Sequence, residues 1–326
     1  MCWASGWIIG RGLASEIPPM AMTFFRWVSA MLILAPFALR PLRHDWPRLR
    51  ECWKPMLGLG VLGVGIHNAL AYLGLNYTTA ANGVILNSFA PVLIVAFSRI
   101  FLGDRLTPLQ AIGVGVSLCG ILMLLSHGSL DALLALRFNI GDLLILLAVA
   151  MWAVYTICLR WRPSGLDNLS FLFVLMCVGD AAVLPLWLGE MALGRHVHWT
   201  LVTSLALLAL GLFSSVLPYL FWHEGVERIG ASVAGLFTHL IPVFGTLMAW
   251  VILDEQLHVY HFAGFALILG GIYMASRFRK SAAAIAADAA PGEAVGLPEA
   301  EGMASSRSTS VPVGHSPSAP ARSARK

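Results

Sequence analysis

The sequence predicts an all-α polytopic membrane protein whose ten transmembrane helices form two inverted five-helix repeats. Three observations lead to this prediction: an apolar composition, a series of apolar runs long enough to cross a bilayer, and a second half that repeats part of the first. Hydrophobic residues make up 58% of the 326 positions and charged residues only 12%, against about a quarter charged in an ordinary soluble domain. Lipid is therefore the expected surroundings of most of the chain.

The chain divides into ten apolar runs up to about residue 276. Most of them hold about 18 to 23 residues, which at about 1.5 Å per residue is enough to cross a hydrocarbon core about 30 Å thick. The runs cover residues 2–14, 20–39, 55–75, 82–102, 109–126, 140–160, 169–189, 200–222, 232–252 and 259–276. The first run looks truncated, because its counterpart at 140–160 has further apolar residues ahead of the Trp-Ala pair that both contain. We therefore expect apolar residues upstream of Met1.

Basic residues concentrate in alternate connections between the runs. One set of connections holds thirteen of them: Arg40, Arg43, Arg48, Arg50, Lys54, Arg99, Arg105, Arg160, Arg162, Arg228, Arg277, Arg279 and Lys280. The other set holds only Arg137 and Arg195. The positive-inside rule therefore predicts a multi-pass protein of the cell (inner) membrane with the first set, and both termini, in the cytoplasm.

The remaining composition excludes several other classes of protein. Residues 281–326 are rich in Ala, Pro, Ser and Gly, which predicts a disordered cytoplasmic tail. The five cysteines are odd in number and lack a C-x-x-C spacing, so neither a disulfide framework nor a zinc site follows. The net charge of +4 is small and lies mainly in loops and tail, and no phosphate-cradling or nucleophile motif is present. We expect no metal, no cofactor and no nucleic acid.

An internal repeat relates the two halves. Residues 71–124 align without a gap to residues 222–275 at a fixed offset of 151, with eleven identities among 54 pairs. The identities include small and kinking residues that let membrane helices approach and bend: Gly74/Gly225, Ala80/Ala231, Pro91/Pro242, Gly113/Gly264 and Gly120/Gly271. Each half has five helices, an odd number, so the two halves must enter the membrane in opposite senses. This is the arrangement of many secondary transporters, although a duplication kept only for packing is the alternative.

Three motifs, taken together and in order, resemble a known family. They are PPMAMTFFRW at 18–27, YLGLNYTTAANGVILNSFAPV at 72–92 and FLGDRLT at 101–107, which is echoed by ILDEQLH at 252–258. The chain up to about residue 276 resembles the EamA-like family of the drug/metabolite transporter superfamily. The resemblance implies one repeat over 1–126 and a second over 140–277, and a carrier of small metabolites that is not an enzyme.

Two prolines mark the middle of equivalent spans. Pro91 and Pro242 each remove the hydrogen bond to the carbonyl four residues earlier. Each freed carbonyl lies beside polar side chains, which are costly in lipid and are expected to face protein or a water-filled cavity. We therefore predict substrate-binding groups at Asn87, Ser88, Thr238 and His239, with a kink satisfied by neighbouring helices as the alternative.

Ionisable residues inside the spans are the next candidates: Arg26, His67 and Asp180. Arg26 matches the family's helix 2 arginine and could clamp a carboxylate with two parallel hydrogen bonds, or instead snorkel to the interface. The charged form of Asp180 is destabilised in a low-dielectric bundle. We predict that Asp180 is the proton-coupling group, with His239 as the rival and a packing role as the alternative.

Further residues receive weaker assignments. Trp152 and Tyr155 could line a cavity, although aromatic residues in membrane helices more often pack or anchor. Four ionisable residues near span ends are expected to be solvated at the interface: Asp142, Glu190, His223 and Glu224.

The leading function is a secondary active transporter, a proton-coupled exporter of small metabolites such as amino acids or related compounds, working by alternating access. One alternative is an intramembrane enzyme that uses Asp180, or His223 with Glu224, on a lipid-linked substrate. A third is a scaffold or sensor, for which the tail shows no binding motif. The predicted partners are a small-molecule substrate, the lipid bilayer and protons, while monomer and homodimer both stay open.

Overall fold

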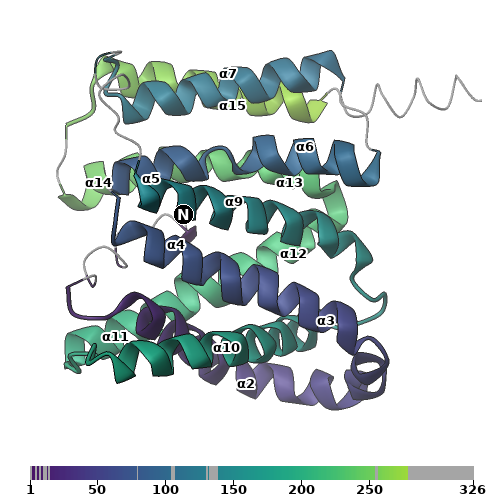
Figure 1. Cartoon of the computed structure of the whole chain (residues 1–326). Helices are drawn as coiled ribbons and strands as arrows, with labels where there is room; N and C mark the ends of the chain where they lie inside the picture. Colours follow the sequence, from purple (N-terminus) through teal and green to yellow (C-terminus); the bar gives the residue numbers. More distant parts are fainter. Residues whose placement is uncertain are drawn as a thin grey trace, which may run out of the picture. The chain divides into compact units, whose positions relative to one another are not determined.

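The computed structural model describes residues 2–3, 6, 9, 13, 15–78, 80–103, 107–129, 131, 139–253 and 256–277. All of them fall in one compact unit, Met1–Ala284, and every regular element among them is helical (Figure 1). Nine helical segments in this part of the chain are long and apolar enough to cross a membrane. They correspond to the second to tenth predicted runs, whereas the predicted tail and most of the first run lie outside the described residues.

The long helix α2 (Pro19–Glu51) differs from its prediction at both ends. The expected run stopped at residue 39, but the helix continues through Pro36, Pro41 and Pro47 to Glu51, because hydropathy measures the apolar span and not the length of the helix. At the other end, Glu190 Oε2 accepts hydrogen bonds from Met20 N and Ala21 N at 3.0 and 2.9 Å. The expectation that Glu190 is solvated is therefore wrong: its carboxylate is buried and caps α2.

Two spans carry a π-helical segment in the middle. They are built from α3 (Trp53–Leu59), η1 (Gly60–Ile66) and α4 (His67–Leu75), and from α11 (Leu201–Ala209), η3 (Leu210–Val216) and α12 (Leu217–Ile229). The second span was expected to end at residue 222 but continues to Ile229. His223 is consequently buried inside α12 and not solvated at a span end.

The two spans that contain Pro91 and Pro242 are interrupted just before these prolines. The first consists of α5 (Ala80–Asn87) and α6 (Ala90–Leu102), the second of α13 (Ala231–Leu236), η4 (Phe237–His239) and α14 (Leu240–Leu253). Pro91 lies in the first turn of α6, where its missing N–H has no helical partner to lose.

The other described spans are α7 (Pro108–Leu125), α9 (Ile140–Cys158) with η2 (Leu159–Trp161), α10 (Asn168–Ala192) and α15 (Val259–Arg277). Side-chain caps set the starts of α7, α9 and α10 at Thr107, Asn139 and Asp167. Asp142 takes part in the cap of α9 and also accepts a hydrogen bond from Thr78 Oγ1 at 2.5 Å. Asp142 is therefore buried, contrary to its expected solvation.

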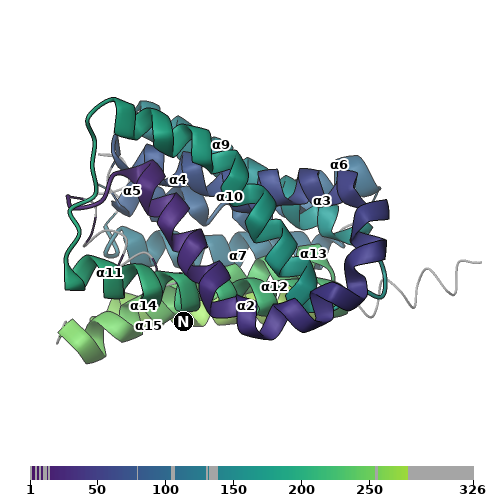
Figure 2. The same ribbon diagram turned by 90° about the horizontal axis from the view of Figure 1, so that it is seen from below.

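Helices α7 and α15 lie side by side at one edge of the bundle (Figure 1). Glycines let them approach: an added Cβ at Gly113 would lie 2.7 Å from the Gly271 carbonyl oxygen, and one at Gly120 would lie 2.7 Å from the Gly264 carbonyl oxygen. At the other edge α2 packs along α10, in the foreground of Figure 2. The largest buried cluster lies between these edges and includes Trp27, Trp152, Tyr155, Phe171 and Tyr219.

The π-helical segments pack across the halves. α10 packs against η1 and α2 packs against η3. A Cβ at Gly60 of η1 would lie 3.0 Å from the Leu175 carbonyl oxygen, and one at Gly211 of η3 would lie 2.9 Å from Ala30 N. Gly60 and Gly211 are separated by the same offset of 151 as the internal repeat.

Candidate functional site

A cavity lies within the bundle. We call it the central cavity. Its walls come from both halves of the sequence, including Trp3, Arg26, His67, Asn68, Tyr72 and Asn87 from the first and Ile145, Trp152, Ser214, Tyr219, Thr238 and Ile241 from the second. Four of the predicted substrate-binding residues, Arg26, Asn87, Trp152 and Thr238, therefore line one space.

Arg26 supplies the charge of the central cavity. It is the one Lys or Arg among the described lining residues, which contain no Asp or Glu. Only 3% of Arg26 is exposed, and its guanidinium carbon lies 5.5 Å from the centre of the Tyr72 ring. Nη2 donates a hydrogen bond to Asn68 Oδ1 at 2.6 Å, whereas the buried Nε has no partner among the described groups. A buried guanidinium with an unused donor is suited to an anionic group.

Asn68 and Tyr219 connect Arg26 to the π-helical segment η1. Asn68 Nδ2 lies 3.3 Å from the Tyr219 hydroxyl, and it also donates to the Val64 carbonyl oxygen at 2.9 Å. The Tyr219 hydroxyl donates to the Gly63 carbonyl oxygen at 2.8 Å. A π-helical turn leaves carbonyls free for such partners and is frequent at functional sites. Arg26, Asn68 and Tyr219 thus form one buried chain of hydrogen bonds.

Aromatic rings form another wall of the central cavity. The Trp152 ring centroid lies 5.5 Å from that of Trp3, 5.6 Å from that of Tyr219 and 5.0 Å from that of His67. His67 Nδ1 is 2.8 Å from the Ala148 carbonyl oxygen, which holds the ring in place. The cavity therefore combines one cation with flat apolar surfaces.

The interrupted spans contribute Asn87 and Thr238 to the central cavity, but their neighbours Ser88 and His239 are engaged elsewhere. His239 Nε2 lies 3.0 Å from the Ser88 carbonyl oxygen, and Nδ1 lies 2.7 Å from Ser117 Oγ. The Ser88 hydroxyl donates to the Ile85 carbonyl oxygen. Neither side chain is among the residues lining the cavity.

Asp180 and Tyr155 are buried outside the central cavity. Asp180 Oδ1 has no hydrogen-bond partner among the described groups, and no described ion pair joins Asp180 to Arg26. The Tyr155 hydroxyl is hydrogen-bonded to His223 Nε2 at 2.5 Å.

The residues considered for an intramembrane enzyme do not form a catalytic pair. His223 bonds to Tyr155, whereas Glu224 accepts a hydrogen bond from Arg228 Nε at 2.5 Å on the exposed side of α12. Within the part of the chain that the structure describes, no group of three His, Cys, Asp or Glu side chains is placed to hold a metal ion.

Comparison with known proteins identifies the family. The profile of the EamA-like transporter family matches residues 1–126 and again residues 139–277. The chain belongs to the EamA-like transporter family. As a member, it is a multi-pass membrane protein of the transporter class and not an enzyme. The double match covers both sets of residues that line the central cavity.

Similar proteins share this assignment. The chain is 29% identical over 237 residues to the uncharacterized transporter YyaM of Bacillus subtilis (strain 168), covering 70% of this chain and 75% of YyaM. It is 25% identical over 280 residues to a protein of Streptantibioticus cattleyicolor named "probable terminal-alkyne amino-acid exporter", covering 84% and 90% of the two chains. A solved crystal structure of a protein 20% identical in sequence has the same fold, with a TM-score of 0.68 over 86% of this chain and 96% of the other.

Sequence reasoning did not select Asn68 and Tyr219. A signal for them exists, because they are separated by 151 residues, the offset of the repeat. Extending the alignment three residues upstream of residue 71 would have paired them. Ser88 and His239, which are also in contact, have the same separation.

Proposed function

We propose that this chain is a secondary active transporter that exports small carboxylate-bearing metabolites, such as amino acids or related compounds, by alternating access coupled to protons. The observation that carries the proposal is the central cavity, in which Arg26 is buried with an unused Nε donor and faces no acid among the described lining residues. A substrate carboxylate is the partner that such a guanidinium favours. The name of the Streptantibioticus relative agrees with this class of substrate.

The two halves act as inverted repeats that rock against each other around the central cavity. Contacts between residues 151 positions apart support this, because residues near a two-fold axis meet their own counterparts. Asn68 contacts Tyr219, and the Ser88 carbonyl contacts His239. The contacts between α7 and α15 follow the same symmetry. The offset of 151 converts the Gly113–Gly271 contact into the Gly264–Gly120 contact. Secondary transporters with inverted repeats place their substrate at the repeat interface.

Asp180 is the group that couples transport to protons. It is buried at mid-length of α10 with one oxygen lacking a partner, so a change in its surroundings alters which protonation state is favoured. Its rival His239 has both ring nitrogens engaged. Coupling requires a different environment of Asp180 in two states of the carrier. Arg26 belongs to α2, which packs along α10. A movement of α2 relative to α10 would change the distance of Arg26 from Asp180 and so supply this difference.

The charge distribution supports an orientation with the basic connections in the cytoplasm of a cell inner membrane. A metabolite screen in inverted membrane vesicles, with and without an imposed pH gradient, tests the proposal. We expect gradient-dependent uptake of at least one carboxylate-bearing metabolite in vesicles that contain the protein, and none in vesicles without it. Uptake confined to cationic or uncharged compounds would contradict the role given to Arg26.

A further inference from the structure

A second cavity lies nearer the end of the bundle at which α2 finishes and α10 begins. We call this end, on the right in Figure 1, the basic end, because Arg48, Arg50, Arg160, Arg162 and Arg228 belong to it. The residues that line the second cavity include Ile157, Arg162, the loop 163–166, His223, Val226 and Ala231. Part of its wall, Ile157 of α9 and His223 and Val226 of α12, comes from two helices that also line the central cavity.

The residues that line the two cavities lie only one to two turns apart along α9 and α12. Along α9, the central cavity is lined by Trp152 and the second cavity by Ile157, five residues or about 7.5 Å farther on. Along α12, Tyr219 and His223 occupy the corresponding positions, one turn apart. Tyr155 lies between Trp152 and Ile157 and is fully buried, and its hydroxyl is bonded to His223. The Tyr155–His223 pair is therefore the polar contact that joins α9 to α12 between the cavities.

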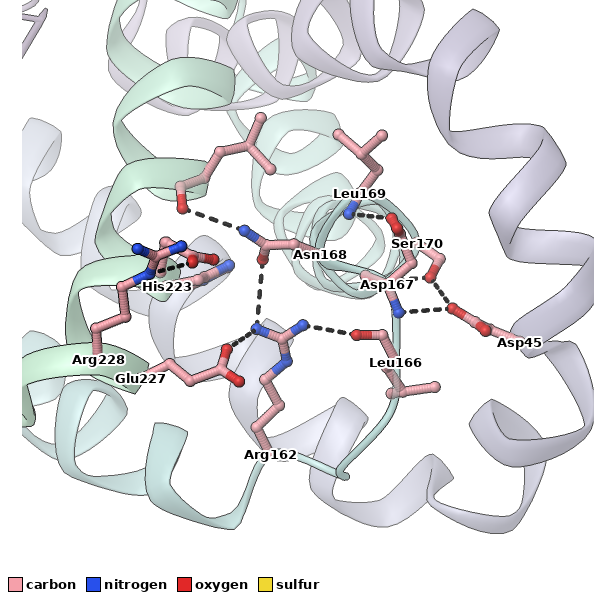
Figure 3. Close-up of polar contacts among 12 residues, drawn as sticks. Asp45, Arg162, Leu166, Asp167, Asn168, Leu169, Ser170, His223, Glu227 and Arg228 are labelled. Atoms are coloured by element: carbon pink, nitrogen blue, oxygen red, sulfur yellow. Dashed lines mark hydrogen bonds and ion pairs between the residues drawn. The ribbon is translucent and has the colours of Figure 1, made fainter.

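Arg162 bridges neighbouring helices at the basic end. It follows η2 and reaches across to α12 and α10 (Figure 3). Nη1 donates to Glu227 Oε2 at 3.1 Å, Nη2 donates to the Leu166 carbonyl oxygen at 2.9 Å, and the guanidinium lies 4.5 Å from the Phe171 ring centre.

The loop beside Arg162 is in turn attached to α2. Asp45 Oδ2 accepts hydrogen bonds from Asp167 N at 2.8 Å and from the Ser170 hydroxyl (Figure 3). This attachment joins α2 to α10, whereas the Arg162–Glu227 ion pair joins the end of α9 to α12. Of these two attachments, only the Arg162–Glu227 ion pair connects α9 to α12, the two helices that line both cavities.

We propose that the second cavity is the vestibule through which substrate reaches the central cavity from the basic end, and that the Tyr155–His223 pair is the gate between them, latched by Arg162 and Glu227. This inference rests on the proposed transport function and adds to it the path and the residues that close it. Opening needs α12 to move relative to α9, and two features ease this movement. Glu227 is largely exposed, so water can replace its partner, and the π-helical segment η3 precedes α12 and can change its hydrogen-bond register.

Cysteine accessibility tests the gate without any substrate. In a full-length variant whose five native cysteines are replaced by alanine, Ala71→Cys places a thiol in the central cavity and Ala231→Cys places one in the second cavity. A membrane-impermeant maleimide is applied to inverted vesicles, which expose the basic end if the charge-based orientation holds, and to intact cells. With the gate intact, we expect the thiol at position 231 to react in inverted vesicles, and the thiol at position 71 to react there much more slowly than the thiol at position 231.

Two changes should open the gate. Tyr155→Phe leaves His223 Nε2 without its partner, and loss of a buried hydrogen bond of this kind should raise the labelling rate of the thiol at position 71 in inverted vesicles about tenfold. Glu227→Ala removes the latch and should raise it about threefold, because exposed ion pairs are weak. Glu224→Ala is the matched control, since Glu224 pairs with Arg228 one turn away on the same helix and contacts neither cavity.

The outcomes are distinct. If the thiol at position 71 reacts no faster in Tyr155→Phe and Glu227→Ala than in Glu224→Ala, the gate assignment is wrong. If Tyr155→Phe does not fold, Glu227→Ala alone decides the question. Absence of labelling at position 231 in both preparations would overturn the vestibule. Failure to find any transported substrate, with the labelling pattern as expected, would instead count against the proposed function and leave the gate intact.

Discussion

Gly271 of α15 is the position at which one added methyl group tests the helix packing most sharply. A Cβ there would lie 2.5 Å from the Gly113 carbonyl oxygen and 2.5 Å from Ser117 N. Ordinary van der Waals contact begins at 3.4 Å, so α7 and α15 would have to separate by about 1 Å, and overpacking of this kind costs about 1–3 kcal/mol. We expect Gly271→Ala to lower the free energy of unfolding by that amount.

Gly270 provides a matched control on the same helix. A Cβ at this position would meet no atom of the described residues within 4 Å. Gly270→Ala should therefore leave stability unchanged or raise it by up to about 1 kcal/mol, because Ala has the higher helix propensity. Thermal unfolding of both purified variants in one detergent, followed by circular dichroism, measures the difference. Equal midpoints for the two variants would refute the close approach of α7 and α15.

Three further predictions address coupling, topology and the start of α2. Asp180→Asn should abolish substrate accumulation driven by a pH gradient while leaving downhill exchange partly intact. If Asp180→Asn accumulates substrate like the parent and His239→Gln does not, the coupling proton belongs to His239. Single cysteines at Thr107 and His258 should react with an impermeant reagent in intact cells only at 258, and labelling of both would end the inverted-repeat interpretation. Glu190→Ala removes the acceptor of two backbone N–H groups and should destabilise the protein by about 1–3 kcal/mol, measured as a lower unfolding midpoint; an unchanged midpoint would remove Glu190 as a cap.

The spans were predictable because a bilayer imposes a length and an apolar composition that can be read directly from the residues. The full length of α2 was not. Two prolines and several arginines after residue 39 resemble a loop, yet the helical backbone accommodates them outside the apolar region. The π-helical segments could not be predicted from the sequence either. The carbonyl groups that they leave free find partners such as Asn68 and Tyr219 only once the helices have packed together.

The site was predictable where the repeat or the membrane environment constrains a residue. Arg26 and Asn87 were selected because charge and freed carbonyls are costly in lipid, and both line the central cavity. Ser88 and His239 were selected for the same reason, but their side chains turn toward Ile85 and Ser117. Which way a side chain points depends on the rotation of each helix about its axis, and that rotation is set by neighbouring helices.

The role proposed for Arg26 is to bind the carboxylate of the transported metabolite. The most direct measurement is the initial rate of uptake of a carboxylate metabolite from the vesicle screen, into liposomes that contain the purified protein. Loss of a charge-assisted hydrogen bond costs about 1.5–3 kcal/mol, so Arg26→Gln should lower the uptake rate at subsaturating substrate at least about tenfold. Arg228→Gln, which removes an equal charge from the exposed face of α12, should retain the rate of the parent. Uptake by Arg26→Gln at the rate of the parent would contradict the account.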